Sequence, residues 1–117
     1  MAKKVFPDGT EVAGFYVRTI RSGPFVFVSG TTSLNAKGQV QGKDAAQQTT
    51  ITMRKIEAGL KSAGAKLGDL VRTTIYVTDI VEYRARLKGL GLAYRRVMGK
   101  HFPAMALVEV QSLFVPN

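Results

Sequence analysis

The stretch AGAKLGDLVRTTIYVTD, residues 63–79, contains the end of a helix, a turn and a strand in succession. Gly64 favours the positive φ at which helices commonly end, so it predicts a helix on its N-terminal side. The run from Val71 to Thr78 is rich in β-branched residues. It predicts a strand with its odd-numbered residues on one face. Helices and strands therefore alternate here, as in a domain whose helices cover a sheet.

The helix before this stretch is predicted from about Asp44 to Ala63. Apolar residues recur there at helical spacing, and Asp44 can act as the N-cap. The apolar face consists of Ala46, Met53, Ile56, Leu60 and Ala63.

Two strands are predicted before this helix. They run from Val12 to Ile20 and from Phe25 to Ser29, with a turn at Arg21–Pro24 between them. Because Phe25–Val28 is apolar throughout, we expect that strand to be covered on both faces. Asn35–Gly38 predicts a further hairpin turn.

Two elements are predicted on the C-terminal side. A helix is expected from about Glu82 to Met98, although Gly89 and Gly91 each weaken it by ~1 kcal/mol relative to alanine. Ala106 to Leu113 is the last predicted strand. The arrangement is α+β, with helices on one face of a mixed sheet. An apolar sheet face left uncovered on the other side would be an oligomer interface.

Length and composition indicate one domain, residues 1–117. The chain has no cysteine and a single histidine. Neither a disulfide framework nor a metal site is therefore predicted. Met1–Pro7 has no apolar core of the kind found in signal peptides, and no window approaches the ~18 apolar residues of a membrane span. The expectation is a cytoplasmic protein with no membrane partner.

The net charge of +9 is unusual for a chain of this length. Six basic residues and no acidic residue lie between Arg84 and Lys100. Two interpretations are open for this stretch: a solvated helix face, or a surface that binds anions such as nucleic acid.

Four segments form a pattern of order and spacing. They are Gly14–Tyr16, Val26–Gly30, residues 63–79 and Phe102–Ala104. On these segments the chain, from about residue 12 to 115, resembles the Rid family of small trimeric proteins, also called the YjgF or L-PSP family. The long segment matches almost residue for residue, whereas Phe15 stands where the family has proline.

The resemblance implies a chorismate-mutase-like α+β fold, in which a mixed sheet carries two helices on one face. It also implies a homotrimer with pockets between subunits that take a small molecule. In the best-understood branch of the family, the reaction is hydrolysis of reactive imines or enamines to ketones and ammonia. That reaction needs a held substrate and a polarised water, so no cofactor is expected.

The resemblance also assigns residues to the site. Tyr16 would place its hydroxyl near substrate and water, or it is a buried tyrosine bonded to a backbone carbonyl. Ser29, Gly30 and Thr31 would form the pocket floor and bind substrate. Glu109 would be an acid–base group, or a salt-bridge partner at a subunit interface.

Met105 stands where the family has an arginine that holds the substrate carboxylate. Losing a bidentate charge-assisted pair costs on the order of 3–5 kcal/mol, or roughly a hundred- to a few-thousandfold in affinity. Met105 and Leu107, on one face of a strand, would instead form an apolar wall that contacts substrate.

The C-terminal end is a second departure. Family members continue into a strand with a glutamate that assists the water, whereas this sequence stops at Val115–Asn117. Either that strand is missing or the sequence is incomplete.

Three functions are compatible with these features. The first is an imine or enamine hydrolase whose substrate lacks the usual carboxylate. The second is a non-catalytic trimer that binds a small metabolite. The third, which the absence of an aromatic stacking platform disfavours, is the RNA binding or endoribonuclease activity suggested by the family's other label.

Overall fold

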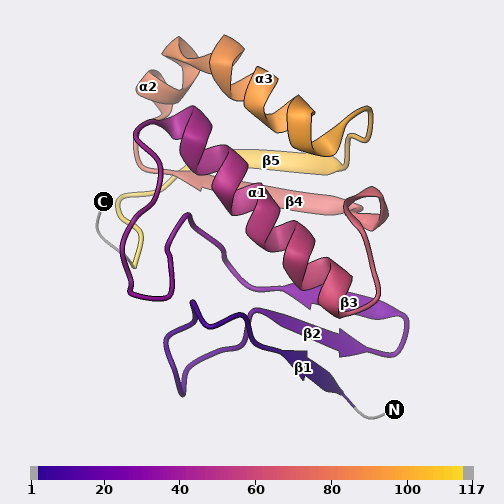
Figure 1. Cartoon of the computed structure of the whole chain (residues 1–117). Coiled ribbons are helices and arrows are strands. Elements are labelled where there is room, and N and C mark those ends of the chain that lie inside the picture. Colours follow the sequence, from indigo (N-terminus) through magenta and orange to yellow (C-terminus); the bar gives the residue numbers. More distant parts are fainter. Residues whose placement is uncertain (1–2, 115–117) are drawn as a thin grey trace.

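The structure, a computed structural model, describes residues 3–114 and has the predicted α+β architecture (Figure 1). In chain order its elements are β1 (Lys4–Phe6), β2 (Thr19–Ser22), β3 (Phe25–Val28), α1 (Ala45–Ser62), the 3-10 turn η1 (Leu67–Asp69), β4 (Arg72–Val77), α2 (Ile80–Ala85), α3 (Leu87–Met98) and β5 (Ala104–Glu109).

The strands form two ladders within the described residues. One is antiparallel, in the order β1-β2-β3, and the other is the parallel pair β4-β5. A parallel pair needs a crossover connection, and here α2 and α3 provide it. Helix α1 packs against α3 and against β3, so both long helices lie on one side of the strands (Figure 1).

Helix α1 agrees closely with the prediction. The Asp44 side chain accepts a hydrogen bond from the Gln47 amide at 2.8 Å, which satisfies one of the unpaired donors of the first turn. Gly64, with φ 82°, follows the end of the helix as predicted.

The core lies where α1 and α3 meet the strands. Its buried members come from α1, η1 and α3, and partly buried residues of β3 and the neighbouring segments surround them. The buried members are Met53, Leu60, Leu67 and Met98.

The predicted strand from Val12 to Ile20 is wrong. Residues 12–18 are irregular, Gly14 has φ 86°, and the strand runs from Thr19 to Ser22. Arg21 and Ser22 pair with β3, so the turn consists of Gly23 and Pro24 alone. Gly23, with φ 61°, occupies the first central position of this two-residue turn, where glycine is favoured.

The predicted helix from Glu82 to Met98 is divided into α2 and α3 at Arg86. The amide of Arg86 bonds to the carbonyls of Glu82 and Tyr83, which closes α2, and its carbonyl accepts from Leu90 in α3. This break lets α3 bury Leu90 and Met98 although no residue of α2 is buried.

The last strand also differs from its predicted span of Ala106 to Leu113. β5 begins at Ala104 and ends at Glu109 because its partner β4 ends at Val77. Beyond that point β4 gives way to α2 and no longer offers a hydrogen-bonding edge.

One face of the strands is uncovered in the single chain. Phe25 and Phe27 of β3 are 64% and 61% exposed, so the prediction that this strand is covered on both faces is wrong for one chain. Val108 of β5 and Tyr76 of β4 are exposed as well. None of the helices in residues 3–114 is both long and apolar enough to span a membrane.

Candidate functional site

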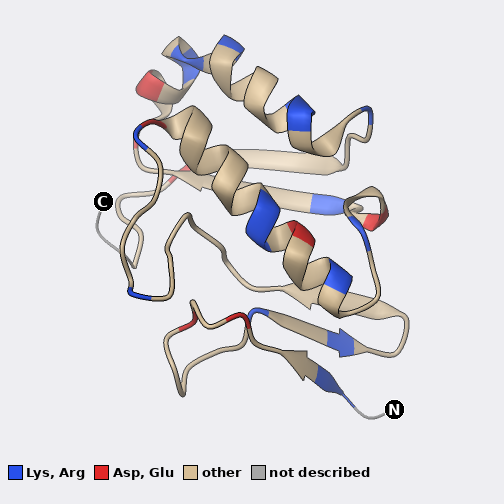
Figure 2. Ribbon diagram, in the orientation of Figure 1, with Lys and Arg blue, Asp and Glu red and all other residues tan. Residues whose placement is uncertain are grey.

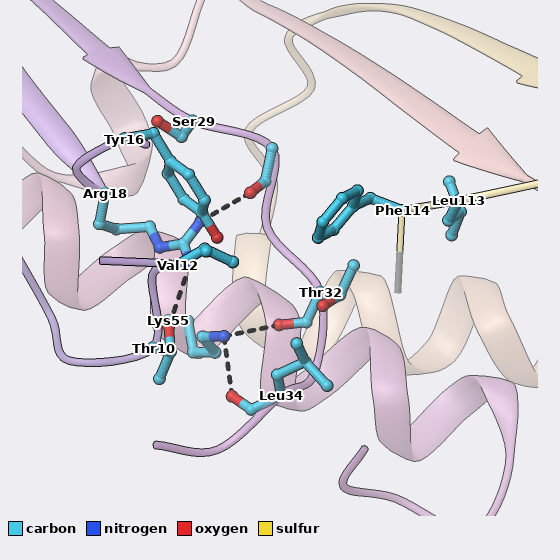
Figure 3. A pocket seen from close by; sticks show the side chains of 11 residues that line it. Thr10, Val12, Tyr16, Arg18, Ser29, Thr32, Leu34, Lys55, Leu113 and Phe114 are labelled. Atoms are coloured by element: carbon cyan, nitrogen blue, oxygen red, sulfur yellow. Dashed lines mark hydrogen bonds between the residues drawn. The ribbon is translucent and has the colours of Figure 1, made fainter. Parts of the chain in front are cut away.

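A hollow of about 490 Å³ opens between the irregular N-terminal segment, the chain that follows β3, helix α1 and the last described residues (Figure 3). Its lining is mainly apolar, with a few polar groups of different kinds. The lining residues are Thr10, Val12, Tyr16, Arg18, Ser29, Gly30, Thr32, Leu34, Lys55, Leu113 and Phe114.

Arg18 holds the wall of this hollow together. Its side chain is 2% exposed, and its Nε donates to Asp8 at 3.0 Å. One terminal nitrogen donates to the Gly30 carbonyl at 2.6 Å and to the Thr31 hydroxyl, and the other donates to the Thr10 hydroxyl. A buried guanidinium needs such partners, because an unpaired buried charge is very costly. We call these five residues the Arg18 network.

Two carboxylates support this network. Burial alone would raise the pKa of Asp8, but hydrogen bonds from Thr10 and Arg18 outweigh it and hold that pKa below its usual value. Glu11 accepts from the amides of Asp8, Gly9 and Arg18, and these bonds likewise outweigh burial and lower its pKa. Both groups are therefore ionised at neutral pH and fix the N-terminal segment around Arg18.

Tyr16 lies over the guanidinium of Arg18, whose Cζ is 5.4 Å from the ring centroid. This distance allows a cation–π contact. The tyrosine is 38% exposed and lines a second, shallower hollow of about 500 Å³ as well. Ser29 lines both hollows and donates its hydroxyl to the Val17 carbonyl at 2.6 Å.

Lys55 approaches the hollow from helix α1. Its Nζ donates to the carbonyls of Thr32 and Leu34 at 2.8 and 2.9 Å, as Figure 3 shows. Burial and then the charge of Arg18 lower the pKa of Lys55, and Asp8 and Glu11 act in the opposite direction. The hollow therefore has two cations in its lining. Among the described residues that line it, none has a carboxylate.

The fold belongs to a known protein family. The family model described as Endoribonuclease L-PSP matches residues 8–117. The chain belongs to the endoribonuclease L-PSP family. This is the Rid or YjgF family that the four segments predicted, so that prediction and its fold are confirmed.

Individual members of the L-PSP family cover most of the chain. A RutC family protein of Pyrococcus abyssi is 31% identical over 116 residues, which are 97% of this chain and 88% of that protein. The 2-iminobutanoate/2-iminopropanoate deaminase of Salmonella typhimurium is 28% identical over 117 residues, with the same coverage. A crystal structure from Mycobacterium tuberculosis, of a YjgF/YER057c/UK114 family member, is 39% identical and has a TM-score of 0.80. That match covers 98% of this chain and 90% of the other.

The structure brings together three of the residues predicted for an L-PSP site. Tyr16, Ser29 and Gly30 all line the hollow. Thr31 lies behind them, where its hydroxyl accepts from Arg18 and donates to the Ser29 carbonyl.

The other predicted residues lie on β5 and are not among those that line the hollow. Met105, Leu107 and Glu109 are in register with the odd-numbered positions of β4, which agrees with one shared face. Met105 is 45% exposed, and Glu109 accepts from the Ile80 amide at 2.9 Å. In one chain Glu109 therefore supports the start of α2.

Sequence reasoning missed Arg18 and Lys55. Arg18 fell within a predicted strand, where its neighbours gave no sign of burial. Lys55 lies about 200° around the helix axis from Met53 and about 100° from Ile56, so the predicted apolar face of α1 gave no signal for it.

The described residues include no group of three or more acidic or histidine side chains placed to hold a metal ion. His101 is not part of the hollow; its Nε2 lies 2.6 Å from the Leu70 carbonyl oxygen. The two alternatives for the C-terminal end, a missing strand or an incomplete sequence, concern Val115–Asn117, which lie outside the described residues.

Proposed function

We propose that this L-PSP protein hydrolyses small reactive imines or enamines to ketones and ammonia, with a substrate selection of its own. The observation that carries this proposal is the hollow that gathers Tyr16, Ser29 and Gly30 against an apolar lining. The printed name of the Salmonella relative supports the reaction class, and 28% identity leaves the substrate of this chain open.

This reaction depends more on positioning the substrate and a water molecule than on a strongly acidic or basic group. Water adds to the carbon of the C=N bond, the nitrogen takes up protons, and the carbinolamine then loses ammonia to leave C=O. A site accelerates this reaction when it holds the carbon near a polarised water and excludes competing solvent. Tyr16 has the hydroxyl for this task, and the apolar lining would hold a short hydrocarbon chain.

The proposal includes a homotrimer whose subunits share the pocket. Phe25, Phe27 and Met105 present exposed apolar surface in one chain, which supports burial against another copy. Light scattering tests this part, and a monomer at micromolar concentration would rule out a shared pocket.

Substrate selection would differ from relatives that have an arginine in the place of Met105. Methionine offers no charge, so a carboxylate would gain nothing from this position. The substrate would then either lack a carboxylate or have it bound by another group.

A non-catalytic metabolite binder is the second candidate, and one observation favours it. None of the described residues that line the hollow has a carboxylate, and Glu109 is engaged with the Ile80 amide. Nucleic acid is a weaker candidate, because Figure 2 shows Lys and Arg spread over several elements rather than gathered on one.

The test is the decay of an imine generated by an amino-acid oxidase, with and without the protein. The Met105→Arg variant is measured in parallel. Acceleration by the unmodified protein supports the hydrolase. Activity in the arginine variant alone would indicate a scaffold tuned to another substrate. No acceleration in either would favour the metabolite binder.

A further inference from the structure

Lys55 is the cation of the hollow that has no ionic partner among the described residues. The ion pairs within residues 3–114 include Arg18 with Asp8, and none includes Lys55. Its ammonium has three N–H donors, of which the Thr32 and Leu34 carbonyls take two. The third donor has no partner among the described residues, and Lys55 lines the hollow.

The two carbonyls also fix where this charge lies. Thr32 and Leu34 belong to the chain that follows β3, so they tie the end of the long lysine side chain to a second element. A lysine held in this way has already lost much of its rotamer freedom, which reduces the entropy that ligand binding would cost.

The surroundings favour an anion at this point. Arg18 lies close enough that its charge lowers the pKa of Lys55. The charges of Asp8 and Glu11 act in the opposite direction, but both carboxylates already accept hydrogen bonds from Arg18 and from backbone amides around it. The mainly apolar lining lowers the local dielectric constant, which strengthens the attraction between the cation and an incoming anion. A carboxylate bound here would satisfy the third donor of Lys55.

We propose that Lys55 binds the carboxylate of a small 2-oxo or 2-imino acid in this hollow. Lys55 thereby provides, from α1, the positive charge that methionine at position 105 does not provide. The bound acid shares the hollow with Tyr16, so its short carbon chain and its C=N or C=O group face the apolar lining and the tyrosine. The imino acid as substrate rests on the proposed function, whereas recognition of the carboxylate does not.

The experiment measures binding by calorimetry at neutral pH with two probes, 2-oxobutanoate and its uncharged primary amide. The unmodified protein is compared with Lys55→Met, which keeps the length of the side chain and removes its charge. Lys61→Met is the matched control, since it removes the same charge from an exposed position of the same helix that does not line the hollow. Circular dichroism verifies that each variant is folded.

The unmodified protein and Lys61→Met should prefer the carboxylate over the amide by about 10- to 100-fold. Lys55→Met should lose this preference and bind both probes with similar affinity. If Lys55→Met does not fold, Lys55→Gln keeps a hydrogen-bond donor without the charge, and the same loss of preference is expected.

Equal binding of both probes by the unmodified protein, or binding of neither at millimolar concentration, would overturn the proposal. So would an undiminished preference in Lys55→Met or Lys55→Gln. Imine hydrolysis is assayed separately. Turnover without carboxylate preference would remove the role of Lys55 and leave the hydrolase standing. Carboxylate preference without turnover would support the role of Lys55 and remove the hydrolase.

Discussion

The Arg18 network and the β5 face differ in how completely one chain builds them. In the network a buried guanidinium has four side-chain or backbone acceptors, of which Gly30 and Thr31 were predicted for the site. On the β5 face, Met105 and Glu109 are exposed, Leu107 is half-buried, and Glu109 accepts from the Ile80 amide. One chain therefore completes the partners of Arg18, whereas it leaves most of the β5 face open.

The largest expected effect comes from breaking the Arg18 network. Arg18→Met should lower the free energy of unfolding by about 3–5 kcal/mol, because the Asp8 carboxylate and the other acceptors lose their buried donor. Urea denaturation measures the change. Arg72→Met, at an exposed position of β4, is the control and should stay within about 0.5 kcal/mol. Equal losses in both variants would contradict the structural role of Arg18.

A second test concerns how closely α1 packs against Thr19 and Arg18. A Cβ at Gly59 would lie 2.5 Å from the Thr19 hydroxyl oxygen and 3.6 Å from Cγ of Arg18. Gly59→Ala should therefore destabilise the protein by about 1–3 kcal/mol through overpacking. Gly89→Ala in α3 meets nothing within 4 Å. It should stabilise by up to about 1 kcal/mol. Thermal unfolding of both variants gives the sign of each change in stability. A gain in stability for Gly59→Ala would show that α1 does not pack closely against Thr19.

Acid should loosen the Arg18 network. The pKa values of Asp8 and Glu11 are lowered in the folded protein from 3.8 and 4.5, so their stabilisation is complete above those values. It is lost as the pH falls through the lower folded values, because the unfolded chain then binds more protons. Glu11→Gln should destabilise by about 1–2 kcal/mol at neutral pH and flatten the acid limb of the stability curve. An acid limb as steep as that of the unmodified protein would exclude Glu11 as a contributor.

On the β5 face, Glu109→Ala removes a single exposed hydrogen bond to the Ile80 amide. We expect a loss of about 0.5–1 kcal/mol in stability. If the protein hydrolyses imines, the kcat of Glu109→Ala distinguishes the two predicted roles of this residue. Loss of an acid–base group would lower kcat by about 10²- to 10⁴-fold, whereas loss of a salt-bridge partner at a subunit interface would leave kcat nearly unchanged. Glu109→Gln, which keeps an acceptor oxygen, should recover most of the stability.

The smallest effect on stability is expected for Met105→Arg. Its side chain is 45% exposed in one chain, and surface substitutions of this kind usually stay within about 0.5 kcal/mol. A larger loss, seen together with dissociation of the oligomer in light scattering, would show that another subunit covers Met105 in solution.

The strongest predictions from sequence were those set by local rules. The cap at Asp44, the glycine after α1 and the β-branched run of β4 lie where the residues themselves favour one backbone conformation. Predictions failed where a partner decides the outcome. The last strand stops at Glu109 because β4 stops at Val77. Residues 12–18 are irregular because a turn interrupts them, in which the Phe15 amide donates to the Val12 carbonyl and Gly14 has a positive φ.

The sequence by itself determined the family, the α+β class and three of the residues that line the hollow, because each is encoded in a short segment with its own pattern. Only the tertiary structure decided that Arg18 is buried and that Lys55 reaches the hollow. Their partners are distant in the sequence: Arg18 joins Asp8 to Gly30 and Thr31, and Lys55 bonds to carbonyls 21 and 23 residues away. A charged side chain reveals its role only when folding brings such partners around it.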